Sequence, residues 1–173
     1  EVGRASVITH QASATKKIIF HPNMLPAKVI CDPCLTIGLP PRITAAVGMD
    51  ALSHSLEAFC ALGNHPQADG IAVEGMRLVS EFLLRAVESP DDIDARSGMM
   101  IASLMGATAF QKGLGAMHSM AHVIGAQLHA HHGLINAVVM PYVLHLNQPS
   151  VADPLARLAR YMDLSEHSFE GFL

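Results

Sequence analysis

Histidine and aspartate side chains that could bind a metal gather in two short stretches of this 173-residue chain. The first stretch, residues 48–57, reads GMDALSHSLE and places Asp50 four residues before His54. The second stretch, residues 115–136, reads GAMHSMAHVIGAQLHAHHGLIN and holds five histidines. Side chains four residues apart on a helix leave the same face about one turn from each other. A carboxylate and an imidazole in that arrangement can bind one divalent cation together.

The second stretch repeats this helical spacing with histidines alone. His118 and His122 are four residues apart, and His132 follows fourteen residues after His118. That separation leaves room for the rest of a helix, a turn and a return to the same point. We therefore interpret one oxygen and three nitrogens as a set suited to Fe(II), Zn(II) or a similar cation. The candidate metal ligands are Asp50, His54, His118 and His132.

Simpler interpretations compete with a metal site. An aspartate four residues before a histidine often forms only a surface pair or a helix cap, and a lone histidine on an apolar face is usually a core residue with satisfied hydrogen bonds. Several histidines fit these simpler interpretations better than they fit a ligand set. We interpret seven as solvated side chains: His10, His21, His65, His129, His131, His145 and His167.

Both stretches resemble the signature regions of the iron-containing (group III) alcohol dehydrogenases. GMDALSHSLEAF and, further along, GLGAMHSMAHVIGAQLHAHHGLINAVVMPYVLHLN carry the resemblance. EVGRASVITH and KVICDPCLTIGLPPRITAAVGMDAL resemble the same family in the same order, so the resemblance covers nearly the whole chain. It implies that the family's metal ligands correspond to Asp50, His54, His118 and His132.

The resemblance also implies roles for residues beside the metal. The family's active-site histidine, close to the reacting carbon and the nicotinamide, corresponds to His122. A lysine that approaches the cofactor ribose corresponds to Lys16 or to Lys17. The family often has proline where this chain has Val123 and His131. Neither position supplies a ligand, so we expect a changed loop shape and unchanged chemistry. A branch of the family that acts without metal has asparagine at the aspartate ligand, where this chain keeps aspartate.

The function implied is hydride transfer between NAD or NADP and a small alcohol or aldehyde. The nicotinamide would carry the hydride, and Fe(2+), with Zn(2+) as the alternative, would polarise the substrate oxygen. Two other functions stay open: a zinc-dependent relative of glycerol dehydrogenase or dehydroquinate synthase, and a non-catalytic metal-binding helical module. The resemblance further implies a homo-oligomer, a dimer or larger.

Composition excludes several classes of partner and location. The net charge is −4, with acidic and basic residues interspersed, which argues against nucleic-acid binding. No apolar run reaches the roughly 18 residues of a membrane helix, and we find no signal peptide. Three cysteines, an odd number, suit a reducing cytoplasm better than a disulfide framework. We interpret the CxxC of Cys31 and Cys34 as a turn after a strand.

Residues 1–38 are predicted to be a strand-rich remnant of an N-terminal α/β nucleotide-binding domain. The sequence contains no GxGxxG and no Walker loop, so we expect the C-terminal part of a longer enzyme, inactive without the missing domain and also short of its natural C-terminus. Unpaired strand edges in this remnant would make it poorly stable alone. The predicted strands are Ala5–Thr9, Lys17–Phe20 and Ala27–Cys31.

Residues 39–173 are predicted to form an all-helical, metal-binding catalytic domain, similar to the C-terminal domain of dehydroquinate synthase, so the fold class is mainly α. Helical periodicity starts after Pro40. One predicted helix carries His118 and His122, and another, from Gly133, is bent or interrupted at Pro141. Short connections imply a bundle that holds the ion by inward-pointing side chains. The other predicted helices are 41–62, 67–88, 92–111 and 151–162.

Overall fold

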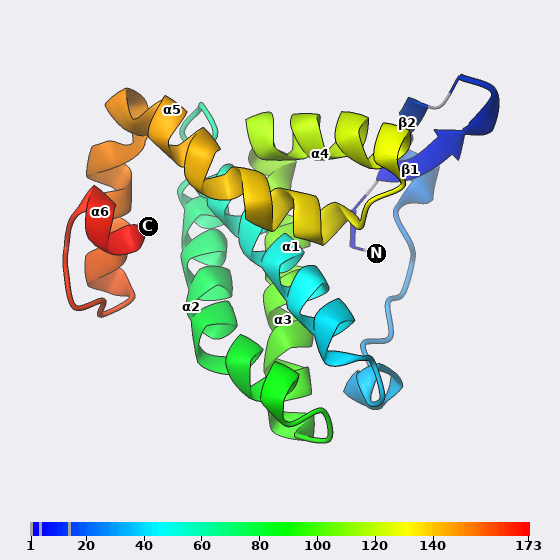
Figure 1. The fold of residues 1–173 in the computed structure, drawn as a ribbon, viewed down its shortest axis with the longest axis horizontal. Coiled ribbons are helices and arrows are strands. Elements are labelled where there is room, and N and C mark those ends of the chain that lie inside the picture. The colour runs from blue at the N-terminus through cyan, green and yellow to red at the C-terminus, as the bar shows by residue number, and fades with distance from the viewer. Residues whose placement is uncertain (1, 4, 14) are drawn as a thin grey trace.

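The computed structural model describes residues 2–3, 5–13 and 15–173, and it confirms a mainly helical fold with a small β segment (Figure 1). The division into segments 1–38 and 39–173 stays a prediction. The strands are β1 (Ala5–His10) and β2 (Thr15–Phe20), and the helices are α1 (Pro41–Cys60), α2 (Pro66–Glu88), α3 (Ile93–Ala109), α4 (Ala116–Leu128), α5 (His132–Tyr161) and α6 (Phe169–Phe172). Short 3-10 turns are η1 (Gln11–Ser13), η2 (Pro22–Met24), η3 (Pro33–Thr36) and η4 (Phe110–Lys112).

The N-terminal strands form an antiparallel hairpin that lies beside the end of α4 (Figure 1). Ala5 pairs with Phe20 and His10 pairs with Thr15, so the first two predicted strands are confirmed. The third, over residues 27–31, is wrong, because these residues are irregular. A β-rich run such as Val29-Ile30 becomes a strand only where another strand supplies its hydrogen-bond partners.

Helices α1, α2 and α3 pack against one another and begin within one residue of their predicted starts. Pro41 opens α1, where its missing N–H is tolerated. The carboxylate of Asp92 accepts a hydrogen bond from the backbone N–H of Ala95 at 3.0 Å and caps α3. The imidazole of His65 caps α2 in the same way, through the N–H of Ala68.

Helix α5 corrects the prediction for the C-terminal third. It is one helix of 30 residues that includes Pro141, Pro149 and Pro154, so the predicted helix over 151–162 is its second half, and the last helix is the short α6. An interior proline costs about 3 kcal/mol, but α5 has buried apolar residues on both sides of Pro141 that hold it in place, among them Ile135 before it and Val143 after it. Figure 1 shows that α5 changes direction along its length, as expected of a helix kinked by proline.

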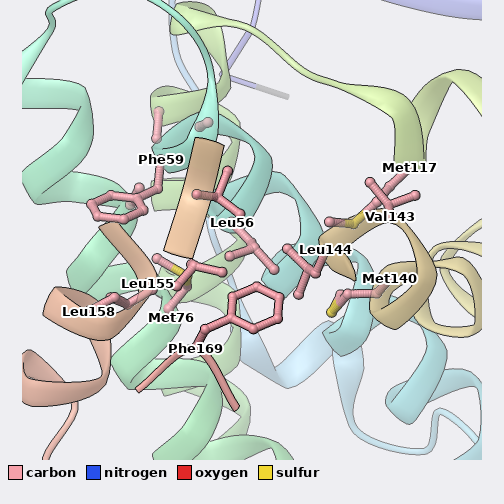
Figure 2. Close-up of a cluster of buried hydrophobic side chains, with 14 residues drawn as sticks. Leu56, Phe59, Met76, Met117, Met140, Val143, Leu144, Leu155, Leu158 and Phe169 are labelled. Carbon is pink, nitrogen blue, oxygen red and sulfur yellow. The ribbon is translucent and has the colours of Figure 1, made fainter. Parts of the chain in front are cut away.

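The main hydrophobic core joins α1 to α2, α5 and α6. Figure 2 shows side chains from these helices, together with Met117 of α4, converging on one interior, and Phe169 anchors α6 in it. Because the same core fixes α1 against α5, it also fixes the two candidate ligands on α1 relative to the start of α5. Among the described residues, no helix combines the length and the apolar character needed to cross a bilayer. The core includes Leu56, Phe59, Met76, Val143, Leu144, Leu155, Leu158 and Phe169.

Candidate metal centre

The four predicted ligands come together from three helices. Asp50 and His54 lie one turn apart on α1, His118 is in the first turn of α4, and His132 is the first residue of α5. Donor atoms of Asp50, His54 and His118 all lie within 4.8 Å of one another. The Oδ1 atom of Asp50 is 3.8 Å from Nε2 of His118 and 3.6 Å from Nε2 of His132. Residues up to 82 positions apart in the sequence (132 − 50) therefore surround one carboxylate oxygen.

This geometry and the free donor atoms fit a divalent cation. Tetrahedral ligands about 2.1 Å from an ion lie about 3.4 Å from each other, close to the separations around Asp50. Nε2 of His118 is buried and has no hydrogen-bond partner among the described residues. The rings of His54 and His118 stack with centroids 4.6 Å apart. A buried nitrogen lone pair beside a carboxylate is the environment in which an imidazole binds a metal.

Two further polar residues hold this cluster, and the sequence interpretation missed both. The buried carboxylate of Glu57 contacts Nδ1 of His118 at 2.7 Å, and the buried amide of Asn136 donates to Oδ1 of Asp50 at 2.7 Å. A signal for each was present, because Glu57 follows Asp50 by seven residues and Asn136 follows His132 by four, which are same-face helical spacings.

A glycine lets α5 approach α1 at the site. A Cβ atom added to Gly133 would lie 2.0 Å from the carbonyl oxygen of Ala46 and 3.1 Å from Cβ of Asp50. No side chain fits there without moving one of the two helices. Because residue 133 has no side chain, α5 lies close to α1, and this brings the neighbouring His132 to Asp50.

Burial keeps two of the candidate ligand imidazoles, those of His54 and His132, neutral at neutral pH. It lowers the pKa of His54 from 6.5 to about 4, although the charge of Asp50 opposes this shift. It likewise lowers the pKa of His132 from 6.5 to about 4. The pKa of Glu57 is lowered even though burial acts to raise it, because hydrogen bonds from His118 and from backbone N–H groups outweigh burial. At neutral pH the imidazoles of His54 and His132 therefore offer lone pairs, and the carboxylate of Glu57 is ionised.

These pKa shifts predict that the metal-free protein loses stability as the pH falls from about 6.5 to about 4. The unfolded chain protonates His54 and His132 near pH 6.5, whereas the folded state does so only near pH 4. Their contribution is complete above pH 6.5 and is lost as the pH falls through 4. Urea unfolding at about pH 7.5 and about pH 5 measures the loss, and His54→Phe should reduce it. An equal pH dependence in the two proteins would contradict this explanation.

A cavity of about 680 Å³ opens onto the four candidate ligands. One face of the β1–β2 hairpin forms its wall, and Lys16, which is half-buried, points into it from that face. Lys17 is exposed and lies on the opposite face, because side chains alternate along a strand. Of the two lysines, only Lys16 lines this cavity. Phe110 closes another side, with its ring 5.1 Å from that of His54.

His122 lies beside the cluster of candidate ligands and lines the same cavity. Its ring centroid is 5.0 Å from that of His132. Burial, followed by the positive charge of Lys16, lowers its pKa. The cavity therefore holds a neutral imidazole that is close to the candidate ligands and open to a bound molecule.

The remaining predicted features lie outside this cavity. The seven histidines interpreted as solvated are exposed, as predicted. Cys31 and Cys34 are exposed free thiols, and Cys34 lies in the turn η3, which follows an irregular segment and not the predicted strand. A second cavity, of about 320 Å³, is lined mainly by apolar residues of α1, α3 and segment 29–39. The described lining of this second cavity contains none of the candidate ligands.

Comparisons with known proteins point to one family. The family model described as "Fe-containing alcohol dehydrogenase family, C-terminal" matches residues 44–171 of this chain. The chain is 45% identical to a 4-hydroxybutyrate dehydrogenase of Cupriavidus necator, over 96% of this chain and 46% of that protein. It is 37% identical to an NAD-dependent methanol dehydrogenase of Bacillus methanolicus, over 94% of this chain and 43% of that protein.

Solved structures agree with the sequence comparisons. The iron-containing alcohol dehydrogenase of Thermococcus thioreducens superposes with a TM-score of 0.88 at 29% identity, over 98% of this chain and 44% of that one. The chain thus spans about half the length of the curated relatives it matches.

Proposed function

Because this chain belongs to the iron-containing alcohol dehydrogenase family, we propose that it supplies the metal site of an enzyme that transfers hydride between NAD or NADP and a small alcohol or aldehyde. The observation that carries the proposal is that donor atoms of Asp50, His54 and His118 lie within 4.8 Å of one another, with Nε2 of His132 3.6 Å from Oδ1 of Asp50, at the wall of one cavity. The names of the relatives supply the reaction class, and one of them is NAD-dependent. A homo-oligomeric state and a cytoplasmic location stay predictions.

We propose that Asp50, His54, His118 and His132 hold the metal, with Fe(2+) as the first assignment and Zn(2+) as the alternative. The family description supports iron. When bound, the ion supplies Lewis-acid stabilisation of the negative charge that develops on the substrate oxygen. Three neutral imidazoles and a single carboxylate cancel only one of the two charges of a divalent ion. This donor set therefore leaves positive charge available for a substrate oxygen.

His122 is proposed to orient the substrate or to carry its proton outward. It lies one helical turn after His118 and beside His132, and it lines the cavity. Its lowered pKa keeps the imidazole neutral at neutral pH, so it can accept a proton from an alcohol as the hydride leaves. This role requires contact with the substrate and no bond to the metal.

Lys16 is proposed to contact the ribose of the cofactor. Its side chain enters the cavity from β2, and its Nζ lies 3.4 Å from the position of a Cβ on Gly125 of α4. The lysine therefore crosses from the hairpin to the helix that carries His118 and His122. An ammonium group with three donors can bind ribose hydroxyls at that place.

The function is tested by an NADH-formation assay on the protein at its natural length, loaded anaerobically with Fe(2+). We expect NADH from NAD⁺ with 4-hydroxybutyrate or another small alcohol. His122→Gln should lower kcat by about 100-fold, the smaller end of the usual contribution of acid–base catalysis, and leave the metal content unchanged. His129→Gln, the same change at an exposed position, is the matched control. A metal-loaded protein that binds no nicotinamide cofactor would instead favour a non-catalytic metal-binding module.

A further inference from the structure

Glu57 joins α1 to the start of α4. Its Oε1 atom accepts a hydrogen bond from the backbone N–H of Met117 at 2.7 Å. Its Oε2 atom contacts Nδ1 of His118 at 2.7 Å and accepts from the backbone N–H of His118 at 3.3 Å. The residue is only 4% exposed. Gly115, which precedes α4, has no side chain to cap the helix, so a carboxylate from another helix satisfies these N–H groups.

The backbone contacts determine which partner carries the proton between Glu57 and His118. Backbone N–H groups can only donate, so both oxygens of Glu57 act as acceptors. These backbone donors favour the ionised carboxylate, which can only accept, so we assign Nδ1 of His118 as the donor. An imidazole that binds a metal is neutral and has one N–H, so with the proton on Nδ1 the lone pair available to a metal is on Nε2. That nitrogen is buried, has no hydrogen-bond partner among the described residues, and lies 3.8 Å from Oδ1 of Asp50.

We propose that Glu57 is a positioning residue, which holds His118 in the tautomer with its proton on Nδ1 and thereby directs the Nε2 lone pair at the metal. The inference rests on the proposed metal site. A carboxylate behind a ligand histidine fixes the ring orientation and raises the basicity of the ligand nitrogen. Glu57 thus acts on the metal through His118 without touching it.

The arrangement on α1 supports this role. Asp50, His54 and Glu57 follow one another by four and three residues, so they share one face of α1. One helix therefore presents two candidate ligands together with the residue that orients a third ligand on α4. Space is also kept for the carboxylate, because a Cβ atom on Gly115 would lie 2.8 Å from Oε1 of Glu57.

Glu57→Gln is the variant that separates orientation from support of the fold. The amide has the same size, and its oxygen can still accept from the N–H of Met117. Its NH2 group then faces Nδ1 of His118, which must accept, so the proton of the ring moves to Nε2. We expect the affinity for Zn(2+) alone, measured by competition with a chromophoric chelator on the natural-length protein, to fall by about 10- to 100-fold.

The tautomer is measured separately by nitrogen NMR of the metal-free protein. We expect the proton of His118 on Nδ1 in the unchanged protein and on Nε2 in Glu57→Gln. A proton on Nε2 in the unchanged protein would overturn the inference even if the variant did not fold. A third outcome is that the unchanged protein has the Nδ1 proton but binds no Zn(2+). This result would contradict the proposed metal site, and with it the role of Glu57 toward a metal. The tautomer assignment would still hold.

Asp92→Asn is the matched control. It makes the same carboxylate-to-amide change at the start of α3, where Asp92 caps the helix. We expect its Zn(2+) affinity to stay within about twofold of the unchanged protein. A folded Glu57→Gln protein that also stays within twofold would reduce Glu57 to a helix cap and overturn the proposal.

Discussion

Replacing Asp50 by asparagine is expected to weaken metal binding by at least about 100-fold. Asp50 is the only carboxylate in the proposed ligand set, and its Oδ1 atom lies 3.6 Å from His132 and 3.8 Å from His118. Loss of a residue that merely supports a ligand costs about 10- to 100-fold in metal affinity, so loss of a ligand's charge should cost at least the upper value. Asparagine keeps the size of the side chain and an oxygen that can accept from Asn136, so the fold should survive.

The same variant should lower the rate of hydride transfer by about 1,000-fold. Lewis-acid stabilisation of the substrate oxygen is worth several kcal/mol, and about 4 kcal/mol corresponds to a factor of this size. Metal content by mass spectrometry and NADH formation on the natural-length protein measure the two effects together. Asp153→Asn, the same change at an exposed position of α5, should alter neither. Unchanged turnover in Asp50→Asn would count decisively against the assignment.

The variant Gly133→Ala, which adds one methyl group, is expected to disrupt the metal site although residue 133 is not itself a candidate ligand. The new Cβ atom would overlap the carbonyl oxygen of Ala46, and overpacking of this kind costs about 1–3 kcal/mol. Because the contact is with backbone, the two helices must separate to relieve it. His132 would then move away from Asp50, so metal affinity should fall by at least about tenfold, together with the free energy of unfolding.

Urea unfolding of the metal-free protein and Zn(2+) titration test Gly133→Ala. The matched control is Gly70→Ala on α2, where an added Cβ atom meets nothing within 4 Å. Alanine there should stabilise the protein by up to about 1 kcal/mol, because it favours the helix over glycine, and should leave metal affinity unchanged. If Gly133→Ala destabilised the protein but bound Zn(2+) normally, the position of α5 would not control the site.

Local spacing could group candidate ligands within one helix, because helical periodicity determines which side chains share a face. Asp50 and His54 are placed by that rule alone, whereas His132 was proposed from its distance along the chain from His118 and from family resemblance, and its approach depends on a tertiary contact. Glu57 and Asn136 were missed because their partners are side chains on other helices. A pattern in one segment shows which face a residue occupies and gives no information about the helix that packs against it.

The errors in the fold have a similar cause. Pro141 was predicted to bend or interrupt a helix; α5 changes direction along its length but is not interrupted, because tertiary packing outweighs the local cost of proline. Residues 27–31 have strand composition, but no neighbouring strand pairs with them in the described part of the chain. The choice between Lys16 and Lys17 likewise required the register of the hairpin, which pairs Lys16 with Thr9 and turns both toward the cavity.

Anomalous diffraction at the absorption edge of the bound metal tests the central claim most directly. The crystal should contain the natural-length protein, purified without oxygen and shown by assay to be active. We expect one strong anomalous peak per chain, in contact with the side chains of Asp50, His54, His118 and His132. An active enzyme whose metal peak lay elsewhere, or touched none of these four side chains, would contradict the account.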